Sequence, residues 1–226
     1  MSPRVSSLLA GVRAEFPLLI GVFPFGLIYG ALALSVGLSP ASAQLMSSIV
    51  FAGTAQFIAT QLIHQAAPAA VIVLTIAIVN LRHVLYSASI APYVNHLSVR
   101  WRSLLAYLLT DEAYAAAIVH YEKAGPGETG HWFFLGAGAS LWFTWQISTA
   151  LGIFLGTTIP SSWQLEFALP LTFLAMVMPM LKDRPAIAAA VSAAAVAVLA
   201  HGLPYNLSLI VAAMIGIGTG LFFEAR

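Results

Sequence analysis

Two short groups of charged residues interrupt long apolar stretches of the chain. The first, Asn80–His83, contains Arg82, and the second, Thr110–Glu112, contains Asp111 beside Glu112. An Arg or Asp at the centre of a membrane helix costs roughly 2.5 to 3.5 kcal/mol on insertion scales, so such residues normally face a partner, a cavity or a transport path. The two groups are therefore the first candidates for chemistry, and charge pairing or binding of an ionised ligand is the chemistry that they favour.

The elements that must position these charges are membrane helices. Of 226 residues, 60% are hydrophobic and 8% are charged, whereas a soluble domain carries about 25% charged residues. No Asp, Glu, Lys or Arg occurs in Phe16–Leu81, Thr129–Leu165 or Pro185–Phe223. Since a span needs about 20 apolar residues, the sequence predicts an all-α polytopic membrane protein with about six to eight hydrophobic segments, the first at 16–38. We expect one transmembrane transporter domain over residues 1–226.

Composition also argues against several classes of function. The formal net charge of +1, without runs of Lys or Arg, leaves no basic surface for nucleic acid. Cysteine is absent, which excludes disulfides, thiolate metal sites and thiol nucleophiles. The sequence contains no His-Glu-x-x-His, Gly-x-Ser-x-Gly or Walker lysine motif. We therefore expect no enzyme activity, no cofactor and no metal.

Two hydrophobic segments are expected to be broken or re-entrant. Segment 41–63 carries many polar side chains and has Gly53 in its middle, and segment 164–181 is short and contains two prolines. Broken helices that are buried against protein tolerate such residues well. If segment 41–63 re-enters, Arg100 and Arg102 lie in the cytoplasm together with the N-terminus, as the positive-inside rule requires. If segment 164–181 re-enters as well, Lys182 and Arg184 also lie in the cytoplasm.

The order of span, broken segment and span occurs twice, at 16–92 and at 131–200. One further span lies between the two copies, so the second would be inverted relative to the first, which is a recurrent transporter design. Each copy opens on a span with a Gly-x-x-x-Gly pair, Gly26 with Gly30 and Gly152 with Gly156. Such pairs equally indicate plain close packing of helices.

The two charged groups are expected to meet. Segments 69–92 and 103–121 should form an antiparallel hairpin, in which Arg82 and Asp111 are equally far from the connecting loop. We predict that Arg82 pairs with Asp111 or Glu112, which removes most of the cost of an isolated charge. Two interpretations remain open: the pair only fixes the packing of two helices, or it lines a path for substrate or protons.

Further polar side chains extend the candidate site for substrate binding or coupling. Two stripes at helical spacing are expected to face each other: Tyr107, Asp111 and Tyr114 on one helix, and Arg82, Tyr86 and Ser89 on the other. The remaining candidates are Asn80 and His83 beside Arg82, and Phe51, Gly53, Gln56 and Thr60 on the broken segment. Each neutral residue could instead hold helices together, at about 0.6 kcal/mol per hydrogen bond.

Three stretches of the sequence are similar to a known family of membrane proteins. Val50–Phe57, Val79–His83 and Leu109–Ala113, in this order and after Pro24–Gly26, resemble the AzlC family. The resemblance covers essentially the whole chain, most specifically from Phe16 to about Ala117. It implies the large subunit of a branched-chain amino-acid exporter in the bacterial cytoplasmic (inner) membrane. Such a subunit works with a small hydrophobic AzlD-type partner and exports valine, leucine, isoleucine and sometimes methionine.

The chemistry of a zwitterionic substrate suits the charged groups. Arg82 can bind a carboxylate, and Asp111 or Glu112 can bind an ammonium group. If export uses the proton gradient, the titrating group is expected among Asp111, Glu112, His83, His64 and Glu166. Two other classes of function remain open from the residues alone: a structural or assembly subunit that transports nothing, and an intramembrane enzyme with Asp111 and Glu112 as its acid/base pair.

Overall fold

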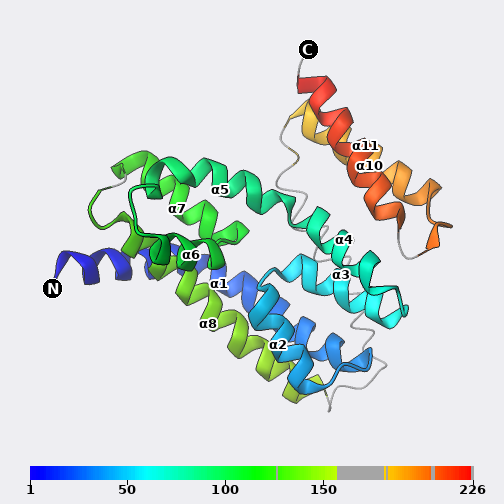
Figure 1. The fold of residues 1–226 in the computed structure, drawn as a ribbon, viewed down its shortest axis with the longest axis horizontal. Helices are drawn as coiled ribbons and strands as arrows, with labels where there is room; N and C mark the ends of the chain where they lie inside the picture. The colour runs from blue at the N-terminus through cyan, green and yellow to red at the C-terminus, as the bar shows by residue number, and fades with distance from the viewer. Residues whose placement is uncertain (126, 157–180, 182, 205–206, 225–226) are drawn as a thin grey trace. The chain divides into compact units, whose positions relative to one another are not determined.

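The computed structural model describes residues 1–125, 127–156, 181, 183–204 and 207–224 (Figure 1). The regular elements of these residues are helices: α1 (Pro3–Ser35), α2 (Pro40–Val50), α3 (Gly53–His64), α4 (Ala69–Val79), α5 (Leu81–Val94), α6 (Val99–Tyr107), α7 (Asp111–Ala124), α8 (Gly130–Gly156), α10 (Arg184–Leu199) and α11 (Leu207–Glu224). Three helical stretches of the described part are long and apolar enough to cross a membrane, namely Pro3–Ser35, Ala69–Val94 and Leu207–Glu224. The predicted all-α class is confirmed.

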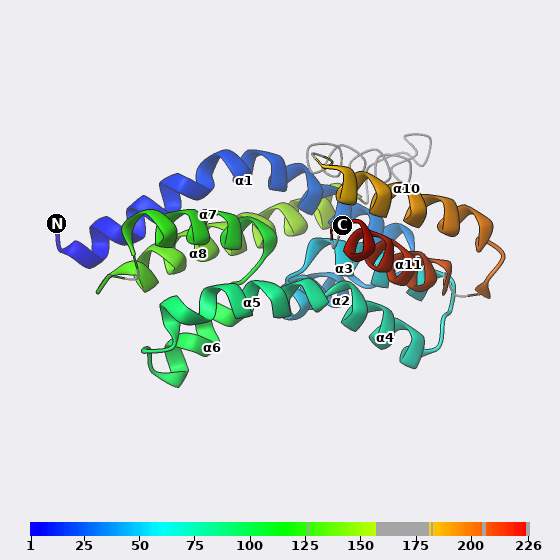
Figure 2. The ribbon, with the colours of Figure 1, turned by 90° about the horizontal axis from the view of Figure 1, so that it is seen from above.

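The helices form two compact units. The first comprises Met1–Thr60 with Val79–Ile159, and the second comprises Gln61–Ile78 with Pro160–Arg226. Within the second unit, α10 and α11 pack side by side and antiparallel (Figure 2), with Gly216 of α11 against Ala189 and Ala193 of α10. Apart from the coupling candidates His64 and Glu166, the candidate residues for binding or coupling lie in the first unit, so that unit positions the site.

Helices α1 and α8 pack side by side and parallel along most of their length (Figures 1 and 2). A Cβ atom added at Gly11 would collide with the carbonyl of Phe133, and one added at Gly30 would collide with the carbonyl of Thr149. Because these glycines let one backbone rest directly on the other, α1 and α8 form the densest contact of the unit.

Both predicted Gly-x-x-x-Gly pairs lie in this α1–α8 contact. A Cβ at Gly26 would collide with Ser148, and one at Gly152 would collide with the carbonyl of Leu27. The pairs therefore serve close packing. The repeats predicted at 16–92 and 131–200 stay a prediction, because residues 157–180 lie outside the described part.

Segment 41–63 is broken, as predicted, between α2 and α3. Phe51 ends α2 in the left-handed conformation, with φ 39° and ψ 46°. Tyr29 of α1 contacts both sides of the break: its hydroxyl donates to the Ala43 carbonyl (2.9 Å), and its ring centroid lies 5.9 Å from that of Phe57. In one straight helix these two residues would be about 21 Å apart, so the chain turns at Phe51. Apart from Leu181, segment 164–181 lies outside the described residues.

The sequence predicts one continuous span at 103–121, and this prediction is wrong. Helix α6 ends at Tyr107, α7 begins at Asp111, and three residues link them. The physical reason is a strong helix start: the Thr110 side chain accepts a hydrogen bond from the Ala113 backbone N–H (3.4 Å), and Asp111 and Glu112 occupy the first turn. A threonine cap followed by acidic residues stabilises a helix N-terminus.

The break reverses the predicted orientation of the helices that carry the charges. Between α5 and α7, Arg82 contacts Asp111, the ring of Tyr86 stacks on that of Tyr114, and the ring of Tyr93 stacks on that of Tyr121. Residue numbers increase together along both helices, so α5 and α7 run parallel and α6 carries the chain back between them. The predicted antiparallel hairpin is wrong.

Candidate functional site

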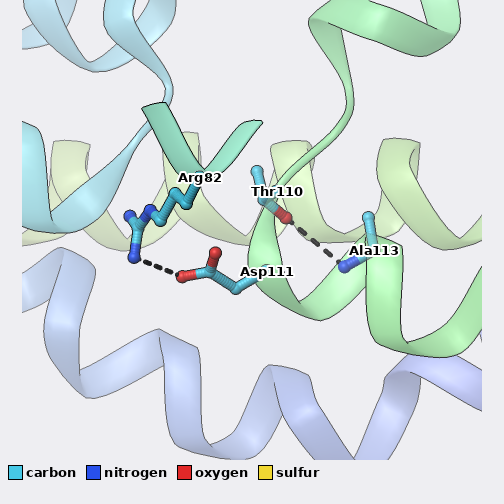
Figure 3. Close-up of polar contacts among 4 residues, drawn as sticks. All are labelled: Arg82, Thr110, Asp111 and Ala113. Atoms are coloured by element: carbon cyan, nitrogen blue, oxygen red, sulfur yellow. Dashed lines mark hydrogen bonds and ion pairs between the residues drawn. The ribbon is translucent and has the colours of Figure 1, made fainter. Parts of the chain in front are cut away.

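The predicted ion pair between the two charged groups is present. Arg82 Nη1 lies 2.7 Å from Asp111 Oδ2, and each side chain is 29% exposed. Figure 3 shows the guanidinium directed at the carboxylate, beside the Thr110 cap of α7. Arg82 stands in the first turn of α5 and Asp111 in the first turn of α7, so the pair joins the N-terminal ends of two parallel helices.

The ion pair leaves several polar atoms without partners. Arg82 Nε, Asp111 Oδ1 and Asn80 Oδ1 are buried and form no hydrogen bond within the described part of the chain. An unsatisfied buried polar group costs about 1 to 3 kcal/mol. These unpaired donors and acceptors lie beside the ion pair and are available to bind a polar ligand.

The two predicted polar stripes face each other over most of their length. The rings of Tyr86 and Tyr114 stack at 4.4 Å between centroids, and the hydroxyls of Ser89 and Tyr114 lie 3.0 Å apart. His83 lies next to this stack, with its ring centroid 6.0 Å from that of Tyr86. Arg82, Asp111 and these side chains therefore form one continuous polar strip between α5 and α7.

Tyr107 belongs to a different contact from the one predicted. Since α6 ends at this residue, it does not continue the stripe of Asp111 on α7. Its hydroxyl donates to the Ser48 carbonyl (2.5 Å) and accepts from Trp142 Nε1 (2.7 Å), and its ring lies 6.0 Å from that of Phe51. Tyr107 thus brings the break between α6 and α7 against the break between α2 and α3.

The candidates on α3 contact α8. Gln56 is fully buried, its Oε1 accepts from Trp145 Nε1 (3.1 Å), and its Nε2 has no partner among the residues described. A Cβ at Gly53 would lie 3.1 Å from the same Trp145 ring, so glycine permits this close approach. The Thr60 hydroxyl donates to the Gln56 carbonyl (2.7 Å), which is a contact within one helix. Within the described residues, the Nε2 atom of Gln56 is therefore available to donate a hydrogen bond to a ligand. The Thr60 hydroxyl already donates its hydrogen within α3.

Sequence reasoning missed the polar face of α8. Gln146 Oε1 accepts from Gln44 Nε2 (2.7 Å) and from Ser48 Oγ (2.8 Å), and Gln146 Nε2 donates to the Ser47 carbonyl (3.2 Å). The hydroxyls of Ser47 and Thr149 lie 3.1 Å apart. The available signal was the spacing of Gln146 and Thr149 by three residues inside an otherwise apolar segment.

Sequence reasoning also missed Glu15, because the first span was expected to begin after it. Helix α1 begins at Pro3, so Glu15 lies inside a helix of 33 residues. Its side chain is fully buried, and neither carboxyl oxygen has a hydrogen-bond partner in the described part of the chain. Helix α7, which has Glu112 in its first turn, packs against α1. No local sequence pattern predicts that Glu15 is buried, because α8, which packs against α1, lies more than a hundred residues later in the chain.

The structure does not place the other two titratable candidates relative to this site. His64 ends α3 and belongs to the second unit. Glu166 lies outside the described residues. Within those residues, no three His, Asp or Glu side chains are placed to hold a metal ion. The structure therefore brings together Arg82, Asp111 and their neighbours on α5 and α7, and a second group around Gln56 and Tyr107.

Known proteins resemble the chain over most of its length. A family model described as AzlC protein matches residues 17–159. An "Uncharacterized membrane protein" from Archaeoglobus fulgidus is 32% identical over 211 residues, which cover 91% of this chain and 90% of the relative. The "Inner membrane protein YgaZ" of Escherichia coli K12 is 26% identical over 223 residues, which cover 96% and 90%. No solved structure matches the chain significantly. Together with its apolar helices, these matches identify a multi-pass protein of the inner membrane.

Proposed function

Because the chain belongs to the AzlC family, we propose that it is the large subunit of an exporter of branched-chain amino acids. Its substrates are valine, leucine and isoleucine, with methionine as a further candidate, and its partner is a small AzlD-type membrane subunit. The observation that carries the proposal is the ion pair of Arg82 and Asp111 at the N-termini of two parallel helices. Charges inside a membrane protein normally mark a transport path.

The ion pair has the composition that an amino-acid zwitterion requires. When the pair opens, Arg82 can receive the substrate carboxylate, and the N-terminal ends of α5 and α7 favour the same negative charge. Asp111 can receive the ammonium group. Arg82 and Asp111 then each face an opposite charge of the substrate instead of each other, so neither is left unpaired in the low-dielectric interior.

The group around Phe51 supplies the features that an aliphatic side chain needs. The rings of Phe51 and Tyr107 lie together where two helices are interrupted, and Phe51 is 6% exposed. Broken helices in transporters present backbone groups and apolar side chains to a substrate near the middle of the membrane. In this proposal the whole chain, residues 1–226, works as one transporter domain, and export is coupled to the proton gradient.

Reconstituted vesicles test the proposal directly. The chain is incorporated with and without an AzlD-type subunit, the vesicles are loaded with labelled valine, and efflux is measured with and without a protonophore. We expect efflux that needs the small subunit, that is inhibited by unlabelled leucine and isoleucine, and that falls when the protonophore is added. Absence of efflux for every amino acid of a full panel, under either direction of the pH gradient, would contradict the proposal.

A further inference from the structure

Glu15 is a buried acidic side chain that the ion pair of the proposed site does not use. It is 0% exposed, and both of its carboxyl oxygens lack a hydrogen-bond partner among the residues that the structure describes. A carboxylate with no partner is far more costly in such a place than a neutral carboxyl group. Glu15 is therefore suited to hold a proton rather than a permanent charge.

The elements packed against α1 supply no Lys or Arg to Glu15. Helices α8 and α2 contain no Asp, Glu, Lys or Arg, and α7 carries Asp111 and Glu112 in its first turn, whereas its Lys123 is exposed in the last turn. Arg13 of α1 itself is exposed and precedes Glu15 by only two residues, so the two side chains leave the helix in different directions. The carboxyl group of Glu15 therefore has no permanent positive charge beside it on these helices.

The histidines of the neighbouring helices lie at a different level. Gly11 rests on Phe133 of α8, and the ring of His120 of α7 stacks on that of Phe133 at 3.8 Å between centroids. His120 is thus level with Gly11, one turn before Glu15, and His131 of α8 precedes Phe133 and lies still further back.

Glu112 connects this buried carboxyl group to the ion pair. It follows Asp111 directly in the first turn of α7, and α7 packs against α1, the helix that carries Glu15. Negative charges on neighbouring helices oppose each other, so Glu15 and Glu112 are more easily accommodated when one of them holds a proton. The two residues thus form a proton-holding group next to the pair that receives the substrate.

We propose that Glu15, with Glu112, is the proton-binding site of the exporter. This inference rests on the proposed function and adds to it the residue that carries the coupling. A proton from outside binds one of the two carboxylates, crosses while the zwitterion leaves through the site of Arg82 and Asp111, and is released to the cytoplasm. The exchange moves H⁺ inward and the amino acid outward, with no bond made or broken other than that to the proton.

The test replaces Glu15 with glutamine, which has the shape of the protonated carboxyl group but cannot release a proton. Glu128→Gln, in an exposed loop, is the matched control. The first readout is the stimulation of valine efflux by an inward pH gradient, in vesicles that contain the chain with its small subunit. We expect the stimulation to disappear in Glu15→Gln and to persist in Glu128→Gln. Glu15→Gln with the full stimulation of the natural chain would overturn the proposal.

A second readout does not depend on transport. Infrared difference spectra of the complex between acidic and alkaline pH report the C=O stretch of carboxyl groups that gain a proton. We expect this band to be lost or diminished in Glu15→Gln, and an unchanged band would overturn the assignment even if no amino acid is transported. Should Glu15→Gln fail to fold, Glu112→Gln replaces it, and an unchanged band together with full stimulation in that variant counts against the proposal in the same way.

Discussion

Removing one partner of the Arg82–Asp111 ion pair should be more damaging than removing both. At 2.7 Å and an effective dielectric constant of about 20, two unit charges attract each other by about 6 kcal/mol. Much of this attraction only offsets the cost of removing the charges from water. Truncation of one partner in a buried pair typically costs about 3 to 5 kcal/mol, because the other charge is left alone. Since each side chain here is 29% exposed, we expect about 3 kcal/mol for Asp111→Ala or Arg82→Ala.

The double variant Arg82→Ala/Asp111→Ala leaves no lone charge, so its free energy of unfolding should decrease by less than that of either single variant. The charge-swapped variant, with Arg82→Asp and Asp111→Arg, keeps an opposite pair and should recover most of the lost stability. It should not recover export, because the positive charge would then stand on α7 and the negative charge on α5, which reverses the site for the zwitterion. Unfolding of the purified protein in detergent and valine efflux from vesicles measure the two effects separately. A swapped pair with full export would show that the pair only holds α5 to α7, and this would refute the assigned role.

Three further substitutions, the first with a matched control, test the packing and polar contacts of the first unit. Gly30→Ala should cost about 1 to 3 kcal/mol in unfolding measurements, because its Cβ collides with the α8 backbone; Gly21→Ala, whose Cβ meets nothing within 4 Å, should be neutral or slightly stabilising. Tyr107→Phe removes the hydroxyl that joins α6 to α2 and α8, and it should lower the free energy of unfolding by about 1 to 2 kcal/mol. An unchanged free energy of unfolding would count against these two hydrogen bonds. Gln146→Leu leaves polar groups of α2 without a partner and should cost about 2 to 4 kcal/mol, whereas a neutral result would mean that water replaces the side chain.

The ion pair could be predicted from sequence because it depends on a rule that does not need the fold. Charges deep in apolar segments are costly alone, and the chain offers few partners, so Arg82 had to meet an acidic residue of similar depth. The break at Phe51 could be predicted for a similar reason, since Gly53 and many polar side chains interrupt segment 41–63. In both cases the local sequence conflicts with a simple lipid-facing helix, and this conflict is visible without tertiary structure.

The orientation of α5 and α7 could not be obtained in the same way. Two residues that are equally far from a connecting loop lie at the same depth only if both flanking segments are continuous helices. The segment 103–121, which contains Asp111, is interrupted before the Thr110 cap. The cap is visible in the sequence, but acidic residues inside an apolar segment indicate membrane charges as readily as the start of a helix. The predicted pairing is correct although its geometric reason is wrong, because Arg82 also stands in the first turn of its helix.

The charge balance of the site links proton and substrate. Arg82 offers one positive charge, while Asp111, Glu112 and Glu15 offer three carboxyl groups. If all were ionised, the group would carry two uncompensated negative charges in a region where one is already costly. A proton on Glu15 or Glu112, or the ammonium group of a substrate on Asp111, reduces this excess, so binding of one cation weakens binding of the other. Coupling at the binding step follows from this charge balance, because an ammonium group on Asp111 favours release of the proton from Glu15 and Glu112.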